Sequence, residues 1–372
     1  MKNILVVDDS ALMRKVLCDI INSDKRFQVQ DRAFNGLEAL EMLCKNKYDA
    51  VVMDLNMPRM GGLELLKELQ ARKITAKILV VSSDAEKGAQ ITLDALELGA
   101  LEFVQKPGSV SLNGGGAGDF KTNLLTALSG VLESGVTPVE RPQPKTADKP
   151  QEVLRPKTAD KPQEEPQPTI RKPDKPINVK GSKLVAIASS TGGPKALQSV
   201  IPKLPANLNA PVVVVQHMPE GFTASLAERL NYLSEISVKE AVEGDVLQSG
   251  VVYLARGGKH LNVVTKSGKS VIHYTDEPYR EGVKPCANYM YESLTDSGYD
   301  QIVCVVMTGM GADGTKGIKY LKEKKEIYVI AQEASTCAVY GMPRSIVELG
   351  MANKIAPLMQ LAQEITMNVG VK

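Results

Sequence analysis

The sequence predicts two α/β domains joined by a linker. Two observations support this fold class: short apolar runs alternate with amphipathic segments in both halves of the chain, and the composition changes abruptly near Val136. Nearly continuous apolar runs are typical of parallel strands that are buried on both faces. A chain of 372 residues is long enough for two domains with substantial cores.

The first domain, residues 1–133, is expected to be a doubly wound parallel sheet of five strands. Amphipathic segments such as 11–21 and 36–45 lie between its apolar runs. This alternating strand–helix pattern predicts a parallel sheet with helices on both faces. The expected strands are residues 3–7, 27–33, 50–54, 77–82 and 101–107.

Residues 134–181 are expected to form a proline-rich linker. The segment contains almost no large apolar residues, and the sequence PKTADKPQE at 144–152 recurs at 156–164. Such a segment cannot bury enough apolar surface to offset its ordering entropy, and its prolines favour a semi-rigid tether. We interpret the repeat as a duplication that lengthened the linker; a partner-binding motif is the alternative.

The second domain, residues 182–372, is expected to contain a mostly parallel sheet flanked by helices. The segment 237–275 differs from the rest, because GVVYLARGGKHLNVV and SVIHYTD indicate an inserted β-hairpin region. The expected buried strands are residues 184–188, 211–216, 301–307 and 327–331.

Charge and composition argue against several classes of protein. Lys and Arg number 45 against 43 Asp and Glu, and this net charge of +2 gives no reason to expect nucleic-acid or membrane binding. Five scattered cysteines without C-x-x-C spacing favour a reducing compartment. The N-terminus is not that of a signal peptide, and no apolar stretch approaches the roughly 18 residues of a membrane-spanning helix. We therefore expect a cytoplasmic monomer without membrane insertion.

Polar residues follow four of the five expected strands of the first domain. Asp8 and Asp9 end the first strand, Asp54 the third, Ser82 the fourth and Lys106 the fifth. Each alone is typical of a helix cap, a turn or a solvated charge. Together they meet at the carboxyl edge of the sheet, where clustered carboxylates call for a divalent cation such as Mg²⁺. A carboxylate there can also accept a phosphoryl group.

This constellation resembles the receiver domain of two-component response regulators, over about residues 1–120. The resemblance implies that Asp54 is the phosphoacceptor, with Asp8, Asp9 and Asp54 forming the Mg²⁺ site. It further implies that Ser82 and Lys106 follow the phosphoryl group as switch residues. The first domain would then regulate the second.

The loop SSTGGPKAL in the second domain admits three interpretations: a phosphate-binding loop, a serine nucleophile or a strand-to-helix turn. It matches neither G-x-x-x-x-G-K-[ST] nor G-x-G-x-x-G, which argues against phosphate binding. A serine nucleophile needs a base and an acid that lie near it in space. His217 follows the expected strand at 211–216, and Asp313 lies in a glycine-rich turn after the strand at 301–307. His260 and His273 alternate within the hairpin region and are expected to be surface or structural residues.

Three motifs, S-T-G-G at 190–193, Q-H-M-P at 216–219 and T-G-M-G-x-D-G at 308–314, resemble the catalytic domain of chemotaxis protein-glutamate methylesterases. The resemblance covers nearly all of 183–372, and the domain order matches as well. It implies hydrolysis of glutamate methyl esters on chemoreceptors, often with deamidation of receptor glutamines. It implies no cofactor for ester hydrolysis and a chemotaxis histidine kinase as phosphodonor. The implied roles are nucleophile for Ser190, general base and acid for His217, orienting acid for Asp313, and oxyanion binding for Thr191 and the Met310 N–H.

Two departures from the family pattern leave open points. Ala188 and Ser189 stand where the family has Gly-Ala, so that Ser189 is a second candidate nucleophile, although the position before T-G-G favours Ser190. The linker is long for the family. We expect the unphosphorylated first domain to occlude the active site, with Phe103 either at that interface or in the core. The alternatives from other classes are a DNA-binding output domain and a nucleotide-dependent oxidoreductase.

Overall fold

The computed structural model describes residues 1–82, 87–107, 116–134 and 181–372. The predicted linker, apart from its two end residues, lies outside the described residues. None of the described helices is long and apolar enough to cross a membrane.

The N-terminal domain contains a five-stranded parallel sheet in the order β2-β1-β3-β4-β5. Two buried apolar clusters, one on each face, explain why its central strands are apolar throughout. Local capping fixes the first two helices, because the Ser10 hydroxyl accepts the Met13 N–H and the Asn35 side chain accepts the Glu38 N–H. The elements are β1 (Lys2–Val7), α1 (Ala11–Asn22), β2 (Phe27–Ala33), α2 (Gly36–Lys45), β3 (Ala50–Met53), α3 (Gly62–Ala71), β4 (Ile78–Ser82), α4 (Lys87–Glu97), β5 (Glu102–Gln105) and α5 (Gly116–Glu133).

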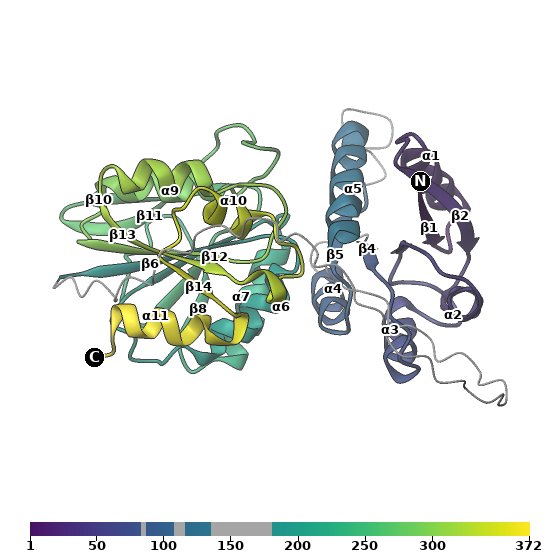
Figure 1. Ribbon diagram of the computed structural model, residues 1–372, viewed down its shortest axis with the longest axis horizontal. Helices are drawn as coiled ribbons and strands as arrows, with labels where there is room; N and C mark the ends of the chain where they lie inside the picture. The colour runs from purple at the N-terminus through teal and green to yellow at the C-terminus, as the bar shows by residue number, and fades with distance from the viewer. Residues whose placement is uncertain (83–86, 108–115, 135–180) are drawn as a thin grey trace, which may run out of the picture.

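The C-terminal domain contains a seven-stranded sheet in the order β14-β13-β12-β6-β7-β9-β8, with every pair parallel. Helices cover both faces of this sheet (Figure 1). The strands are β6 (Lys183–Ser189), β7 (Val212–Gln216), β8 (Ser237–Glu240), β9 (Val251–Leu254), β12 (Gln301–Val306), β13 (Glu326–Gln332) and β14 (Lys354–Ala356). The α-helices are α6 (Gly193–Val200), α7 (Phe222–Leu233), α8 (Ala287–Ser293), α9 (Thr315–Lys322), α10 (Met342–Glu348) and α11 (Leu361–Val369).

The hairpin region is confirmed in part. β10 (His260–Lys266) and β11 (Lys269–Thr275) pair antiparallel and form a two-stranded sheet of their own. Residues 237–240 and 251–254 were also expected in this region, and for them the expectation is wrong. They form β8 and β9, which pair parallel with each other, and β9 also pairs parallel with β7. Strands of a parallel sheet are buried on both faces, and Val252, Tyr253 and Leu254 of β9 are all buried.

The two domains pack against each other through α4, α5 and β5 of the first and α6 and α7 of the second (Figure 1). Across this contact the rings of Phe103 and Phe222 lie with their centroids 4.5 Å apart. Arg229 on α7 forms ion pairs with Asp94, at 2.8 Å, and with Glu97, both on α4. Phe103 is buried in an apolar cluster that continues across this contact, so it belongs both to the core and to the interface, the two places considered for it from the sequence.

Candidate active site and acidic site

The candidate catalytic residues come from loops after neighbouring strands. β12, β6 and β7 are adjacent and parallel, so their carboxyl ends meet at one edge of the sheet. Ser190 follows β6, His217 follows β7, and Asp313 lies in the turn between β12 and α9. Backbone bonds tie the loops together: the Ser190 N–H donates to Thr308 O at 3.0 Å, and the His217 N–H donates to Ser189 O at 3.1 Å. The sheet thus brings the three predicted residues together.

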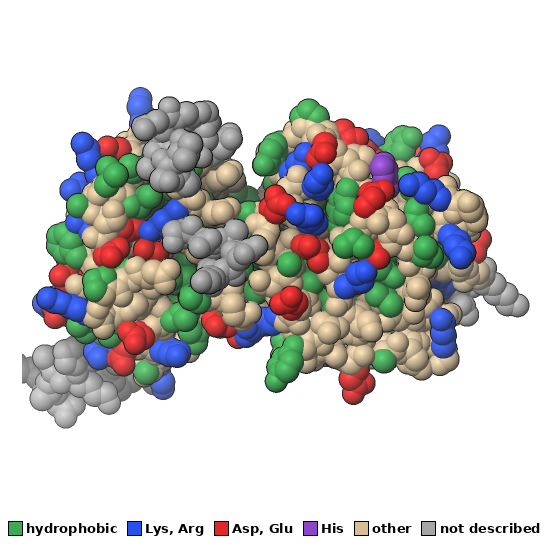
Figure 2. Space-filling model, turned by 180° about the vertical axis from the view of Figure 1, so that it is seen from behind, with side chains coloured by type: hydrophobic (Ala, Val, Ile, Leu, Met, Phe, Trp, Pro, Cys, Tyr) green, Lys and Arg blue, Asp and Glu red, His purple; other side chains and the backbone are tan. Residues whose placement is uncertain are grey.

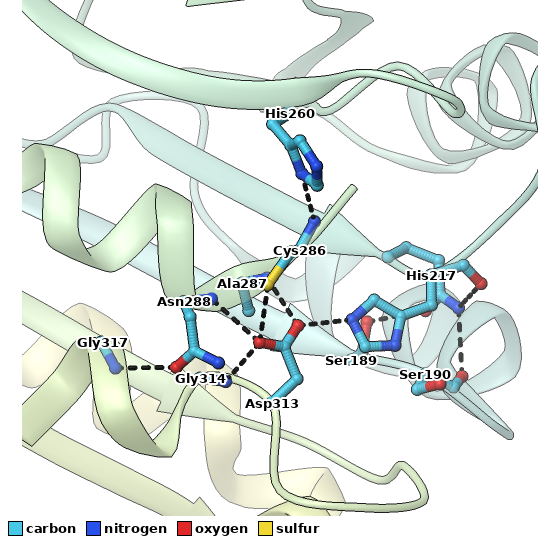
Figure 3. Close-up of polar contacts among 11 residues, drawn as sticks. Ser189, Ser190, His217, His260, Cys286, Ala287, Asn288, Asp313, Gly314 and Gly317 are labelled. Carbon is cyan, nitrogen blue, oxygen red and sulfur yellow. Dashed lines mark hydrogen bonds and ion pairs between the residues drawn. The ribbon is translucent and has the colours of Figure 1, made fainter. Parts of the chain in front are cut away.

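Asp313 and His217 form a buried pair. His217 Nε2 lies 2.8 Å from Asp313 Oδ2, and the Asp313 side chain is only 4% exposed. Burial alone would raise the pKa of Asp313, but the bond to His217, its charge, the Cys286 thiol and the Ala287 N–H lower the pKa to about 2. Asp313 is therefore an ionised carboxylate at neutral pH, and it holds the imidazole in one orientation (Figure 3).

Ser190 lies on the other side of the imidazole. Because Nε2 faces Asp313, Nδ1 is the ring nitrogen left for Ser190, and Figure 3 shows it on the Ser190 side. Ser190 is partly exposed, and Gly309 packs so closely that a Cβ built on it would lie 2.8 Å from the Ser190 Cβ. Gly309 therefore brings the turn that carries Met310 against the loop of Ser190 and Thr191, and the oxyanion role expected for Thr191 and the Met310 N–H stays a prediction. The part of the chain that the structure describes contains no hydrogen bond between the Ser190 hydroxyl and His217.

Ser189 occupies a different environment from Ser190. It is fully buried, and its hydroxyl donates to Gln216 Oε1 at 2.7 Å. The Gln216 amide nitrogen donates in turn to Ser190 O at 3.0 Å and His217 O at 3.1 Å. Gly193 leaves the space for this amide, because a Cβ there would overlap Gln216 Oε1. Ser189 thus holds the loops from within the core.

The acidic residues of the first domain also lie together. One carboxylate oxygen each from Asp8, Asp9 and Asp54 lies within 4.8 Å of the others. An all-oxygen donor set of this kind fits Mg²⁺. Lys106 Nζ lies 2.7 Å from Asp8 Oδ2 and 2.8 Å from Asp54 Oδ2. Burial alone would lower the pKa of Lys106, but the bonds to the two carboxylates outweigh it and raise the pKa.

Ser82 lies at the same edge of the sheet as this acidic site. It is 2% exposed and ends β4, and its carbonyl accepts the Lys106 N–H at 2.6 Å. Among the described residues the Ser82 hydroxyl makes no hydrogen bond to Asp54. Lys106 therefore contacts Asp54, the candidate phosphoacceptor, and Ser82 ends β4, the strand that neighbours β3.

Residues of the first domain also reach the catalytic edge of the second. A Cβ built on Gly130 of α5 would lie 3.3 Å from Met310 Sδ and 3.5 Å from the Thr191 hydroxyl. Burial raises the pKa of the Glu102 carboxyl on β5, while the Phe103 N–H, the Thr191 hydroxyl and the charge of His217 act in the opposite direction. The first domain thus covers the side of the active site that Thr191 and Met310 line.

Three residues at these sites were not assigned from the sequence. Gln216 stands within the Q-H-M-P motif, so its position was a usable signal. Glu102 follows the expected strand pattern of β5, and only the docking of the domains brings it to the active site. Cys286 donates its thiol to Asp313 Oδ1 at 3.0 Å, and nothing in its local sequence indicates that contact.

Comparisons with known proteins cover both domains. Residues 185–365 match the CheB methylesterase family, and residues 4–112 match the response regulator receiver domain. The protein-glutamate methylesterase/protein-glutamine glutaminase of Bacillus subtilis is 41% identical over 98% of each chain. The protein of the same name from Pyrococcus abyssi is 39% identical over 97% of this chain and 92% of the other. The crystal structure of the Thermotoga maritima CheB methylesterase catalytic domain is 41% identical, with a TM-score of 0.48, and covers 50% of this chain and 98% of that one.

The family model and the relatives of about 40% identity favour the esterase over the two alternatives considered from the sequence. On the face shown in Figure 2, Lys and Arg side chains are interspersed with Asp and Glu. A protein that binds DNA through its output domain is expected to present a basic patch or stripe. The visible surface agrees with the nearly balanced charge of the sequence.

Proposed function

Because the chain belongs to the family of CheB protein-glutamate methylesterases, we propose that it is a phosphorylation-regulated serine hydrolase that removes methyl groups from glutamate methyl esters of chemoreceptors. This activity serves adaptation in chemotaxis. The observation that carries the proposal is the 2.8 Å contact between His217 Nε2 and Asp313 Oδ2 at the sheet edge where Ser190 lies. All three residues come from one chain, so a monomer suffices for the reaction.

The proposed mechanism is acyl transfer through Ser190. His217 Nδ1 removes the hydroxyl proton as Ser190 Oγ attacks the ester carbonyl. Thr191 and the Met310 N–H bind the oxyanion of the tetrahedral intermediate. His217 then gives its proton to the departing methanol. Asp313 stabilises the imidazolium during both steps and stays ionised, in keeping with its low pKa of about 2.

Water completes the cycle. His217 removes a proton from a water molecule, which attacks the acyl carbonyl and releases the receptor glutamate and the Ser190 hydroxyl. The same route with a glutamine substrate releases ammonia in place of methanol. The relatives' names include protein-glutamine glutaminase, and we extend that activity to this chain. Neither reaction draws on a cofactor in this proposal.

The first domain is proposed to switch the second. Asp54 accepts a phosphoryl group from a chemotaxis histidine kinase, with Asp8, Asp9 and Asp54 as ligands of Mg²⁺. When bound, Mg²⁺ supplies charge neutralisation for phosphoryl transfer. Lys106, which lies 2.8 Å from Asp54 Oδ2, exchanges that carboxylate for the phosphoryl oxygens, and Ser82 follows them.

Occlusion explains how the switch acts. Three residues of the first domain lie against the catalytic domain. Glu102 interacts with Thr191, Gly130 lies beside Thr191 and Met310, and Phe103 packs on Phe222. A cytoplasmic receptor segment cannot reach Ser190 from this side while the domains are docked. Phosphorylation at Asp54 weakens the docking and opens the site.

The test is methanol release from methylated receptor membranes. Wild type and Ser189→Ala should both release methanol, whereas Ser190→Ala should lose at least about a thousandfold in kcat. Loss only in Ser189→Ala would reassign the nucleophile. Full activity in both variants would rule out the triad. Mass spectrometry of receptor peptides after incubation reports on glutamine deamidation in the same samples.

A further inference from the structure

The carboxylate of Asp313 is surrounded by hydrogen-bond donors. Oδ2, which faces His217, also accepts the Ala287 N–H at 2.6 Å. Oδ1 accepts the N–H groups of Asn288 at 3.0 Å and Gly314 at 2.8 Å, and it accepts the Cys286 thiol at 3.0 Å (Figure 3). Among the described residues, two side chains therefore bond to the Asp313 carboxylate, those of His217 and Cys286, and the other donors are backbone N–H groups.

The backbone of Cys286 is itself fixed. Its N–H donates to His260 Nδ1 at 3.2 Å, and His260 Nε2 lies 3.2 Å from Pro278 O. Both Cys286 and His260 are fully buried. On the other side, the Asn288 side chain accepts the Gly317 N–H at 2.7 Å and so joins α8 to α9. The thiol is therefore directed at Asp313 by a network on both sides.

The thiol remains a donor throughout the working pH range. Burial and the negative charge of Asp313 both raise the pKa of Cys286, so the group stays protonated. A protonated thiol next to a carboxylate donates one hydrogen bond, and a buried oxygen that loses such a donor carries an uncompensated desolvation cost.

We propose that Cys286 is a positioning residue for ester hydrolysis, whose thiol holds Asp313 Oδ1 so that Oδ2 stays directed at His217 Nε2. The inference rests on the triad of the proposed function. Cys286 lies beyond Asp313 as seen from Ser190, so it touches neither the nucleophile nor a substrate bound there (Figure 3).

Removal of the donor has a defined consequence for the reaction. Asp313 Oδ1 then keeps only backbone donors, and the carboxylate gains freedom to turn away from Nε2. In the molecules whose carboxylate still faces Nε2, its charge is less well compensated by donors, so it favours the imidazolium form of His217 more strongly. The acidic limb of the pH profile therefore moves to higher pH. The titratable groups that face this pair are Cys286, Tyr291, Glu102 and, behind Cys286, His260.

The experiment compares full-length variants after treatment with acetyl phosphate and Mg²⁺, by methanol release as a function of pH and receptor concentration. Cys286→Ala should lower kcat about three- to tenfold, leave KM within about twofold, and shift the acidic limb upward by roughly half a pH unit. Cys286→Ser supplies a hydroxyl donor and should restore both kcat and the pH profile.

Cys304→Ala is the matched control. Cys304 is a buried residue on β12, and in the described part of the chain its thiol makes no hydrogen bond. Its truncation leaves a similar cavity and should keep the wild-type pH profile. A Cys286→Ala enzyme with wild-type kcat and pH profile would overturn the inference, as would equal impairment of Cys286→Ala, Cys286→Ser and Cys304→Ala. Ser190→Ala is measured alongside; its activity tests the triad independently of Cys286.

Discussion

At the scale of single residues, the adjacent serines 189 and 190 have opposite environments. Ser189 is the last residue of β6 and donates into the core, whereas Ser190 begins the loop and is partly exposed. The Gln216 side chain bonds to both residues, because it accepts a hydrogen bond from the Ser189 hydroxyl and donates one to Ser190 O. One buried amide therefore sets the spacing between the loop that carries Ser190 and the loop that carries His217.

Gln216→Ala should impair both stability and catalysis. The substitution leaves the Ser189 hydroxyl and the Ser190 and His217 carbonyls without this partner in a site where Gln216 is 1% exposed. We expect a loss of about 2 kcal/mol in the free energy of unfolding and a fall of about tenfold in kcat. Urea unfolding and methanol release measure the two effects. Ser189→Ala removes one of the contacts, so a larger loss in Ser189→Ala than in Gln216→Ala would contradict this account.

His260 should make the C-terminal domain sensitive to mild acid. Burial lowers the pKa of His260 from its usual 6.5. Its Nδ1 accepts the Cys286 N–H, so a proton on Nδ1 would point at the Cys286 N–H and break this hydrogen bond. The unfolded chain then binds a proton that the folded chain refuses. The contribution of neutral His260 to the free energy of unfolding is fully present above about pH 6.5. It falls, by up to about 1.4 kcal/mol per pH unit, as the pH drops towards the pKa of His260 in the folded state.

His260→Gln checks this expectation, because glutamine does not titrate. Urea unfolding between pH 7.5 and 5.5 should show a flatter pH dependence for His260→Gln than for wild type, even if the variant is less stable at pH 7.5. Parallel curves for the two proteins would show that another group causes the acid sensitivity.

At the scale of secondary-structure elements, the sites fall at strand ends because parallel sheets gather their carboxyl ends at one edge. Ser190, His217 and Asp313 each follow a continuous apolar run, so the sequence was sufficient to predict their meeting. Strand β9 was not predictable in the same way, since VVYL suits a hairpin as well as a parallel strand and only its pairing with β7 decides.

Contacts that depend on how whole elements pack could not be predicted from the sequence. Cys286 reaches Asp313 because α8 packs on α9, and no periodicity in the sequence encodes that approach. The same is true of Glu102 on β5, which meets Thr191 only because the domains associate. Motifs thus located the reacting groups, while their supporting neighbours required the tertiary structure.

The α4–α7 contact should set the basal activity. Arg229, whose side chain is 19% exposed, contacts Asp94 and Glu97 through its guanidinium group, and these pairs join the domains directly. Arg229→Glu replaces the attraction by repulsion. We expect methanol release by the unphosphorylated protein to rise about three- to tenfold, with little change after phosphorylation.

Arg72→Glu is the control for this prediction. Arg72 pairs with Glu68 within the first domain, on and beside α3, so its reversal perturbs a surface ion pair without touching the interface. Unphosphorylated Arg72→Glu should have wild-type activity. Equal activation by both reversals would point to a general electrostatic effect instead of undocking.

At the scale of the whole molecule, β5 connects the acidic site to the active site. Phe103 on this strand stacks on Phe222, and Lys106, one residue beyond its end, bonds to Asp8 and Asp54. In the proposed switch, a phosphoryl group on Asp54 gives the Lys106 ammonium a new partner, and we expect a shift of Lys106 to reach Phe103 through β5. Residues 102–106 therefore connect the proposed switch to part of the proposed occluding surface.

Removal of residues 1–181 should activate the enzyme. The truncation exposes the surface around Thr191 and Met310 that Gly130 and Glu102 cover, so we expect methanol release to exceed that of the unphosphorylated full-length protein by about tenfold or more. Asp54→Ala in the full chain should stay at the basal rate with acetyl phosphate present, whereas Asp54→Ala combined with Arg229→Glu should be active without it. An unchanged or lower rate in the truncated protein would refute occlusion. Inactivity of the double variant would mean that phosphorylation does more than undock the domains.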